Sequence, residues 1–227
     1  MKCNIWNKES AEIAFTIGYK IQEIEIFNIE CETFLKALLE ESFFLKNDFF
    51  NDINDLKKAT WLILNDIISS NYDCLQNLKV GNIRMASRVF RDNMENMNIV
   101  EFLNESGKSK YLNDWYKDEI LAHKDYREWL KQTDEDLSIL TRDVYRIYSK
   151  YAHRTYHSIL ESYSLTEDKK LEYKHFTDKN KPEDLKLLSE YYSHLAYFVN
   201  NTVLKYEKYE LISKSKLRTI ITEHISL

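Results

Sequence analysis

The amino-acid sequence predicts an all-α protein, folded as a single-domain bundle of about six or seven helices over residues 1–227. The chain holds only three glycines and one proline, whereas β-sandwiches and doubly wound α/β proteins need turn residues every ten or so positions. Apolar residues make up 44% of the chain, as in folded globular proteins. They recur every three or four positions, which is the period of an amphipathic helix.

The periodic segments predict the helices in order along the chain. They span about 10–46, 55–79, 82–105, 111–131, a segment from Thr133 to about Tyr163, a long helix that begins at Pro182, and a short helix in the tail 211–227. Asn54 or Asp55 can cap the second helix, Gly107 can follow the end of the third, and Pro182 suits a first turn. Residues 166–181 are charged and irregular. The scarcity of glycine and proline and the spacing of three to four between apolar residues predict more than about 60% helix and no sheet.

Charge and cysteine content narrow the class of protein. The net charge of −5 gives no overall signature of nucleic-acid binding, although it permits a local basic site. Cys3, Cys31 and Cys74 are odd in number and widely spaced, which predicts neither a disulfide framework nor a zinc site. The N-terminal residues lack a signal-peptide core, and no stretch of about 18 apolar residues exists. We therefore expect a cytoplasmic protein with no membrane partner.

A polar stripe runs along the helix predicted after Thr133. It consists of Arg142, Arg146, Ser149, His153 and His157, at spacings of four, three, four and four. At about 100° per residue these positions share one narrow face. The apolar residues of the helix cluster on the opposite side, so the sequence predicts an apolar back and a front of guanidiniums, a hydroxyl and imidazoles.

Two interpretations of the stripe remain open. It can be the solvated face that any surface helix shows. It can also be a phosphodiester site, because arginine binds phosphate oxygens bidentately and histidine can take a proton from a ribose 2′-OH or give one to a leaving oxygen. The spacing of His153 and His157 also suits a metal pair, but there is no H-E-x-x-H motif and Arg154 adjoins the pair. No metal and no cofactor is predicted.

A second polar row lies on the helix predicted over 82–105. It includes Arg88, Arg91 and Glu95, opposite a mostly apolar face. Arg91 and Glu95 are spaced i,i+4 and can simply pair in solvent. In the functional interpretation this row faces the first stripe across a cleft. Glu95 then orients an arginine or a histidine, and the arginines follow a nucleic-acid backbone.

Two segments resemble known proteins. Arg146-Ile-Tyr-Ser-Lys-Tyr-Ala-His153 resembles the R-x(4–6)-H motif of HEPN-type helical proteins. The run from Arg88 to Glu95 looks like the R-x-x-x-E helix that precedes the histidine helix in bacterial relatives. The resemblance covers about residues 55–165. It makes Arg146 the motif arginine and His153 the motif histidine. The residue after the motif arginine is usually polar in the family, and here it is Ile147.

The resemblance implies a metal-independent ribonuclease of a toxin–antitoxin or phage-defence system. It also implies a homodimer in which two motif helices form one composite cleft. We therefore predict that the protein cleaves or binds RNA, with His153 as acid/base, Arg146 as phosphate clamp, and Arg142, Ser149, His157, Arg88, Arg91 and Glu95 as binding residues. The alternative is a helical protein-interaction module, a regulator or inhibitor with a protein partner and no nucleic-acid activity.

Overall fold

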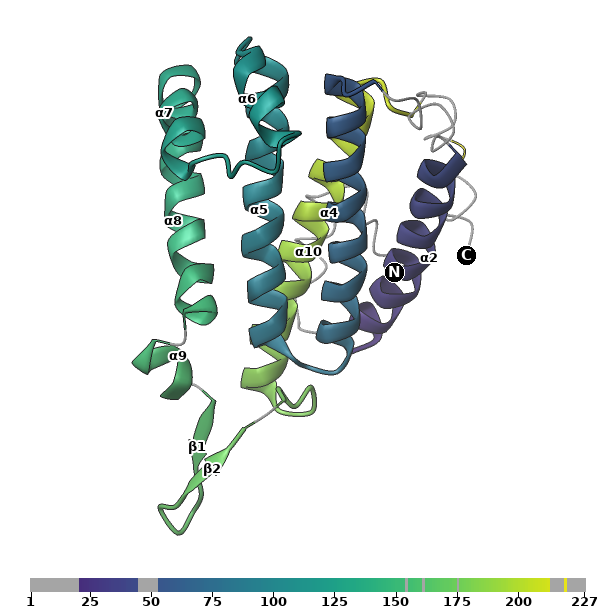
Figure 1. Cartoon of the computed structure of the whole chain (residues 1–227). Helices are drawn as coiled ribbons and strands as arrows, with labels where there is room; N and C mark the ends of the chain where they lie inside the picture. The colour runs from purple at the N-terminus through teal and green to yellow at the C-terminus, as the bar shows by residue number, and fades with distance from the viewer. Residues whose placement is uncertain are drawn as a thin grey trace.

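Long helices dominate the computed structural model (Figure 1). It describes residues 21–44, 53–153, 155–160, 162–174, 176–212 and 219, and 76% of these are helical, which confirms the all-α single-domain bundle. The described helices are α2 (Ile21–Phe44), α4 (Leu56–Lys79), α5 (Ile83–Glu105), α6 (Ser109–Trp115), α7 (His123–Thr133), α8 (Glu135–Ala152), α9 (Tyr156–Leu160) and α10 (Pro182–Lys208). A hairpin of β1 (Tyr163–Leu165) and β2 (Leu171–Tyr173) separates α9 from α10.

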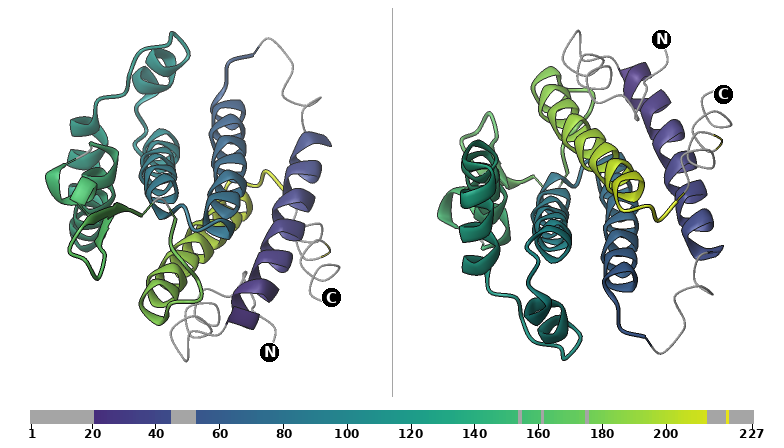
Figure 2. Two further views of the ribbon diagram at one scale, coloured as in Figure 1. Left: turned by 90° about the horizontal axis from the view of Figure 1, so that it is seen from below. Right: turned by 90° about the horizontal axis from the view of Figure 1, so that it is seen from above.

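Four of these helices form the core. α4 and α5 are an antiparallel pair, α10 packs against both, and α2 packs against α4 and α10, while α8 rests on the other side of α5 (Figure 2). Aromatic rings fill the centre, where Phe90 stacks on Phe198 with 5.1 Å between ring centroids. Burying such rings supplies the main stabilisation of the bundle.

Several predicted helix ends are confirmed. Asp55 caps α4, since its carboxylate accepts a hydrogen bond from the backbone N–H of Lys58 over 2.7 Å. Gly107 has a φ of 67° directly after the C-cap of α5, a left-handed conformation that glycine adopts without strain. Pro182 begins α10. Residues 10–20 of the first predicted helix and most of the tail 211–227 lie outside the described residues.

Two predicted helices are each divided, which raises the count from six or seven to eight within the described residues. The helix predicted over 111–131 breaks after α6, where Asp118 takes a left-handed φ of 61° and the hydroxyl of Tyr116 donates to the carbonyl of Asp55 over 2.7 Å. The helix predicted to reach Tyr163 ends at Ala152 and restarts as α9. The prediction of two continuous helices is therefore wrong.

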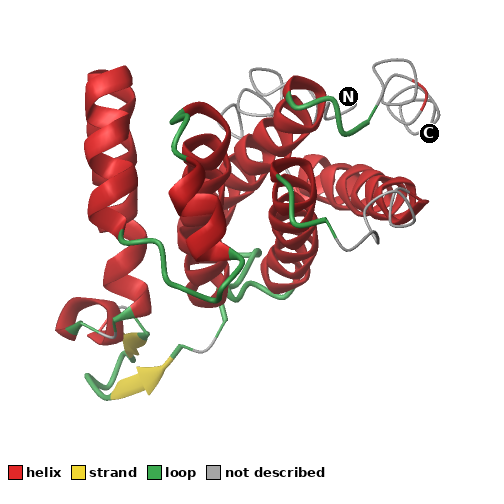
Figure 3. Ribbon diagram, turned by 45° about the horizontal axis from the view of Figure 1, so that its top comes forward, coloured by secondary structure: helices red, strands yellow, loops and turns green. Residues whose placement is uncertain are grey.

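The expectation of no sheet is also wrong. β1 and β2 pair antiparallel, with Tyr163 opposite Tyr173 and Leu165 opposite Leu171 (Figure 3). The turn between them closes through Thr166, whose backbone N–H donates to the carbonyl of Lys170 over 2.9 Å. Three residues per strand are too few to produce a recognisable period-two pattern in the sequence. The charged residues of the turn between the strands make the segment look like a loop. None of the described helices is long and apolar enough to cross a membrane.

Among the long helices around the core, α8 has the fewest buried side chains. Tyr148 is the buried side chain among its described residues, and it packs on Phe90. Leu140 and Ile147 belong to the predicted apolar back, yet they are 54% and 53% exposed. The apolar back of this helix is therefore only partly covered by α5.

Candidate functional site

The predicted polar stripe is divided between two helices. His153 is the C-cap residue of α8, and its backbone N–H donates to the carbonyl of Ser149 over 3.0 Å. His157 lies in α9, and its side chain is outside the described part of the structure. The prediction that all five residues share one helix is wrong, because the chain leaves the axis of α8 after its C-cap.

The remaining stripe residues lie mostly in solvent. Arg142, Arg146 and His153 are exposed, and the Nε of Arg142 donates to the carboxylate of Asp143 over 3.1 Å. Ser149 is half-buried. This arrangement suits a solvated helix face and also a surface that contacts a polyanion, so both interpretations of the stripe stay open.

The second predicted row contacts α8 at a residue outside the stripe. Arg91 and Glu95 form an ion pair of 3.1 Å, and each side chain is 21% exposed. Arg91 also donates to the hydroxyl of Tyr145 over 3.1 Å and lies over its ring. α5 and α8 thus pack together at this point, and Tyr145 makes the contact rather than Arg146.

α7 adds three side chains to the pair. The Nε2 of His123 is 3.7 Å from a carboxylate oxygen of Glu95, and its Nδ1 is 2.5 Å from the hydroxyl of Tyr126. The guanidinium carbon of Arg127 lies 4.7 Å from the ring centroid of Tyr145. We call these side chains the polar cluster: Arg91, Glu95, His123, Tyr126, Arg127 and Tyr145.

The α7 members of the polar cluster are not among the site residues that the sequence predicts. His123, Tyr126 and Arg127 are spaced i, i+3 and i+4, which places them on one helix face. That spacing is a usable signal. Because the periodicity predicts one continuous helix over 111–131, it does not indicate that α7 turns back along α5.

The electrostatics of the polar cluster follow from its partial burial. Burial alone lowers the pKa of Arg91, but the hydrogen bond from Arg91 to Tyr145 and the charge of Glu95 outweigh it and raise that pKa. Burial and then the charge of Glu95 raise the pKa of Tyr126 well above its usual value. The Arg91 guanidinium therefore remains charged and Tyr126 stays a neutral hydroxyl.

A cavity of about 520 Å³ gives access to the polar cluster. Its lining includes Glu95, His123 and Tyr126, the rings of Trp115 and Tyr116, and the side chains of Asp118 and Glu119. The rings of Trp115 and Tyr116 meet edge to face, with centroids 5.0 Å apart. A group that enters this cavity therefore meets an imidazole, three carboxylates and aromatic surface together.

The seam between α5 and α8 continues past the polar cluster towards the start of α5. The Nε atoms of Arg84, Arg88 and Arg91 and the Oγ of Ser149 are buried and have no hydrogen-bond partner among the described residues. Arg84 and Arg88 also line a cavity of about 280 Å³ with Tyr151 and Ser158. Buried polar groups normally have a partner, so these four atoms are unsatisfied groups of the seam.

Comparisons with protein families, with curated proteins and with solved structures find no match to this chain. The resemblance to HEPN-type proteins therefore stays a prediction. No group of three or more histidine, cysteine, aspartate or glutamate side chains that could hold a metal occurs within the described ranges.

Proposed function

We propose that this protein binds RNA and cleaves its phosphodiester backbone at the polar cluster. The observation that supports this proposal is the position of His123, between the carboxylate of Glu95 and the hydroxyl of Tyr126. Arg91 and Arg127 lie beside it on Tyr145. A fixed imidazole next to two guanidiniums is the combination that phosphoryl transfer needs, namely proton transfer and charge stabilisation.

The chemistry follows from these roles. The Nε2 of His123 takes the proton from a ribose 2′-OH, and the 2′-oxygen attacks the adjacent phosphorus. The bond to the 5′-oxygen breaks, and that oxygen takes a proton from solvent water as it leaves, which yields a 2′,3′-cyclic phosphate and a 5′-hydroxyl; the proton held on His123 then returns to solvent. Arg91 and Arg127 hold the phosphate oxygens as negative charge builds up. Glu95 faces the Nε2 of His123 across 3.7 Å and orients the imidazole.

Arg146 and His153 are the alternative centre that the resemblance implies. Eight residues separate Tyr145 from His153, which is about 12 Å along a helix axis. His123 contacts the ring of Tyr145, so the two histidines lie near different turns of α8, and we propose separate roles for them. In the proposed complex Arg142, Arg146 and His153 contact flanking phosphates of the strand, because they form an exposed row on the helix that carries Tyr145.

The test compares the two histidines in the full chain with a fluorescent single-stranded RNA. His123→Ala is expected to slow cleavage about 10²–10⁴-fold, as loss of a general base does. His153→Ala is expected to weaken RNA binding, and to have a much smaller effect on the rate at which bound RNA is cleaved. Lys124→Ala is the matched control, because Lys124 is an exposed neighbour of His123 that pairs with Glu128.

Two other results would replace this proposal with one of the alternatives. If His153→Ala abolishes cleavage and His123→Ala does not, the centre is the one implied by the HEPN-like motif. If the wild-type chain neither binds nor cleaves RNA, the interaction-module alternative replaces the proposal. Cytoplasmic localisation, a role in toxin–antitoxin or phage-defence systems and the homodimer are further parts of the proposed function.

A further inference from the structure

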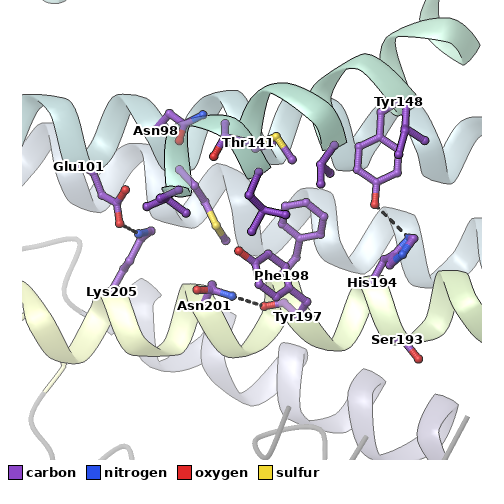
Figure 4. Close-up of a pocket in the computed structure, with 16 residues that line it drawn as sticks. Asn98, Glu101, Thr141, Tyr148, Ser193, His194, Tyr197, Phe198, Asn201 and Lys205 are labelled. Atoms are coloured by element: carbon purple, nitrogen blue, oxygen red, sulfur yellow. Dashed lines mark hydrogen bonds and ion pairs between the residues drawn. The ribbon is translucent and has the colours of Figure 1, made fainter. Parts of the chain in front are cut away.

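A groove between α8 and α10 lies over α5 (Figure 4). None of the six residues of the polar cluster lines it. It encloses about 320 Å³, and most of its wall is apolar. Met94 and Met97 form its floor on α5, Leu140 and Val144 form the α8 wall, and Phe198 projects from α10. Volumes of about 300–1,000 Å³ with an apolar lining and a few polar groups are typical of small-molecule sites.

Polar pairs mark the two ends of the groove (Figure 4). At one end Lys205 forms an ion pair with Glu101, so the two charges of the lining neutralise each other. At the other end the hydroxyl of Tyr148 and the Nδ1 of His194 are 3.0 Å apart. Desolvation among neighbouring aromatic rings lowers the pKa of His194, which keeps its imidazole neutral at pH 7. The groove therefore presents no unpaired charge.

The Tyr148–His194 pair can still bind a further group. If His194 carries its proton on Nε2, Tyr148 donates to Nδ1, and the pair keeps the Nε2–H donor and a tyrosine lone pair. If the proton is on Nδ1, the tyrosine hydroxyl is the spare donor and Nε2 is the spare acceptor. In either tautomer the pair offers one donor and one acceptor, which a hydroxyl or an amide satisfies.

From this arrangement we propose that the groove between α8 and α10 binds a neutral, mostly apolar small molecule, whose single hydroxyl or amide group pairs with Tyr148 and His194. The body of the ligand lies against Leu140, Val144 and Phe198. Methionine side chains adapt to irregular apolar shapes, so Met94 and Met97 suit a floor that receives such a body. This inference does not depend on the proposed RNA chemistry.

The probe for this site is 2-naphthol, which is neutral at pH 7, carries one hydroxyl and fluoresces. We expect saturable binding to the full chain and a rise in Tm. Thr141→Trp places an indole in the groove, because Thr141 projects into it from α8 (Figure 4), and should abolish binding. Arg142→Trp is the matched control, since Arg142 is the exposed next residue, and should leave binding intact.

Two further measurements test the polar end and the charge of the site. Tyr148→Phe keeps the ring and removes the hydroxyl, and should weaken 2-naphthol binding about tenfold, as loss of one hydrogen bond does. The anion 2-naphthoate should bind more weakly than 2-naphthol. No saturable binding by the folded wild-type chain, or unchanged binding by Thr141→Trp, overturns the proposal. If Thr141→Trp changes the oligomeric state and nothing else, the groove binds a helix of another chain, and the small-molecule proposal is overturned as well.

Discussion

Glu32 joins α2 to α4 through its carboxylate. It accepts from Lys36 of its own helix over 2.8 Å and from Lys79 of α4 over 2.6 Å. These two hydrogen bonds lower the pKa of Glu32 from 4.5 to about 2. A carboxyl group whose pKa is lower in the folded state adds stability above its unfolded pKa, and this stability is lost as the pH falls through the folded pKa.

The first prediction follows from the lowered pKa of Glu32. Glu32→Gln should lower Tm at pH 7, and the difference from wild type should persist down to about pH 4.5 and disappear near pH 2. Thermal unfolding followed by far-UV circular dichroism across this range measures it. Glu40→Gln, an exposed position on the same helix, is the control and should give a small difference at every pH. A Glu32→Gln curve parallel to wild type over the whole range would contradict the prediction.

Single residues also show what sequence periodicity can and cannot predict. Asn93 falls on the core-facing side of its helix by spacing, and it is fully buried in the structure. Its side chain donates to Asn71 of α4 over 2.8 Å. The spacing predicts the face, but the partner depends on how α4 and α5 align. For the same reason the Arg91–Glu95 pair was predictable, whereas its contacts with His123 and Tyr145 were not.

The turn between α4 and α5 depends on Gly81. This residue has a φ of 77°, and a Cβ there would lie 2.4 Å from the backbone oxygen of Thr177. The backbone N–H of Thr177 also donates to the carbonyl of Gly81 over 3.0 Å, which fixes the segment before α10 against this turn. A side chain at position 81 must therefore strain the turn and displace that segment.

The second prediction compares the two glycines with positive φ. Gly81→Ala should lower the free energy of unfolding by about 2 kcal/mol or more, through left-handed strain and the clash with Thr177. Gly107→Ala should cost only about 1 kcal/mol, because its φ of 67° is strained for alanine but nothing lies within 4 Å of the added carbon. Urea unfolding of both variants gives the comparison. Equal losses would show that the contact between Gly81 and Thr177 contributes nothing.

Helix starts were more predictable than helix interruptions. Asp55 and Pro182 carry local capping chemistry, so the sequence alone locates the starts of α4 and α10. The break between α6 and α7 has no glycine or proline, and Asp118 takes the left-handed conformation that glycine would otherwise supply. Tertiary contacts such as the one between Tyr116 and the Asp55 carbonyl hold that break, and periodicity does not report them.

At the scale of the whole molecule, the end formed by α9 and the hairpin stands apart from the bundle (Figure 3). Large apolar side chains are exposed there: Tyr156, Ile159, Leu160, Tyr163, Leu165, Leu171, Tyr173 and Phe176. A lone two-stranded hairpin is marginal in water, and monomeric proteins rarely expose apolar patches of this kind unless they are interaction sites. We therefore propose that a homodimer forms through this end rather than through the two motif helices that the resemblance implies.

The third prediction is a dimer held by the hairpin. Light scattering should give twice the chain mass of 27.3 kDa. Leu165→Glu combined with Leu171→Lys should give the monomer mass with an unchanged helical spectrum. These residues are cross-strand partners that are 70% and 65% exposed, so the new pair keeps opposite charges within the hairpin while removing apolar surface from the interface. Ile120→Lys is the control and should remain dimeric, because Ile120 is exposed in the loop between α6 and α7 and does not belong to the hairpin. A wild-type chain that is monomeric at micromolar concentration, or a double variant that stays dimeric, would refute the prediction.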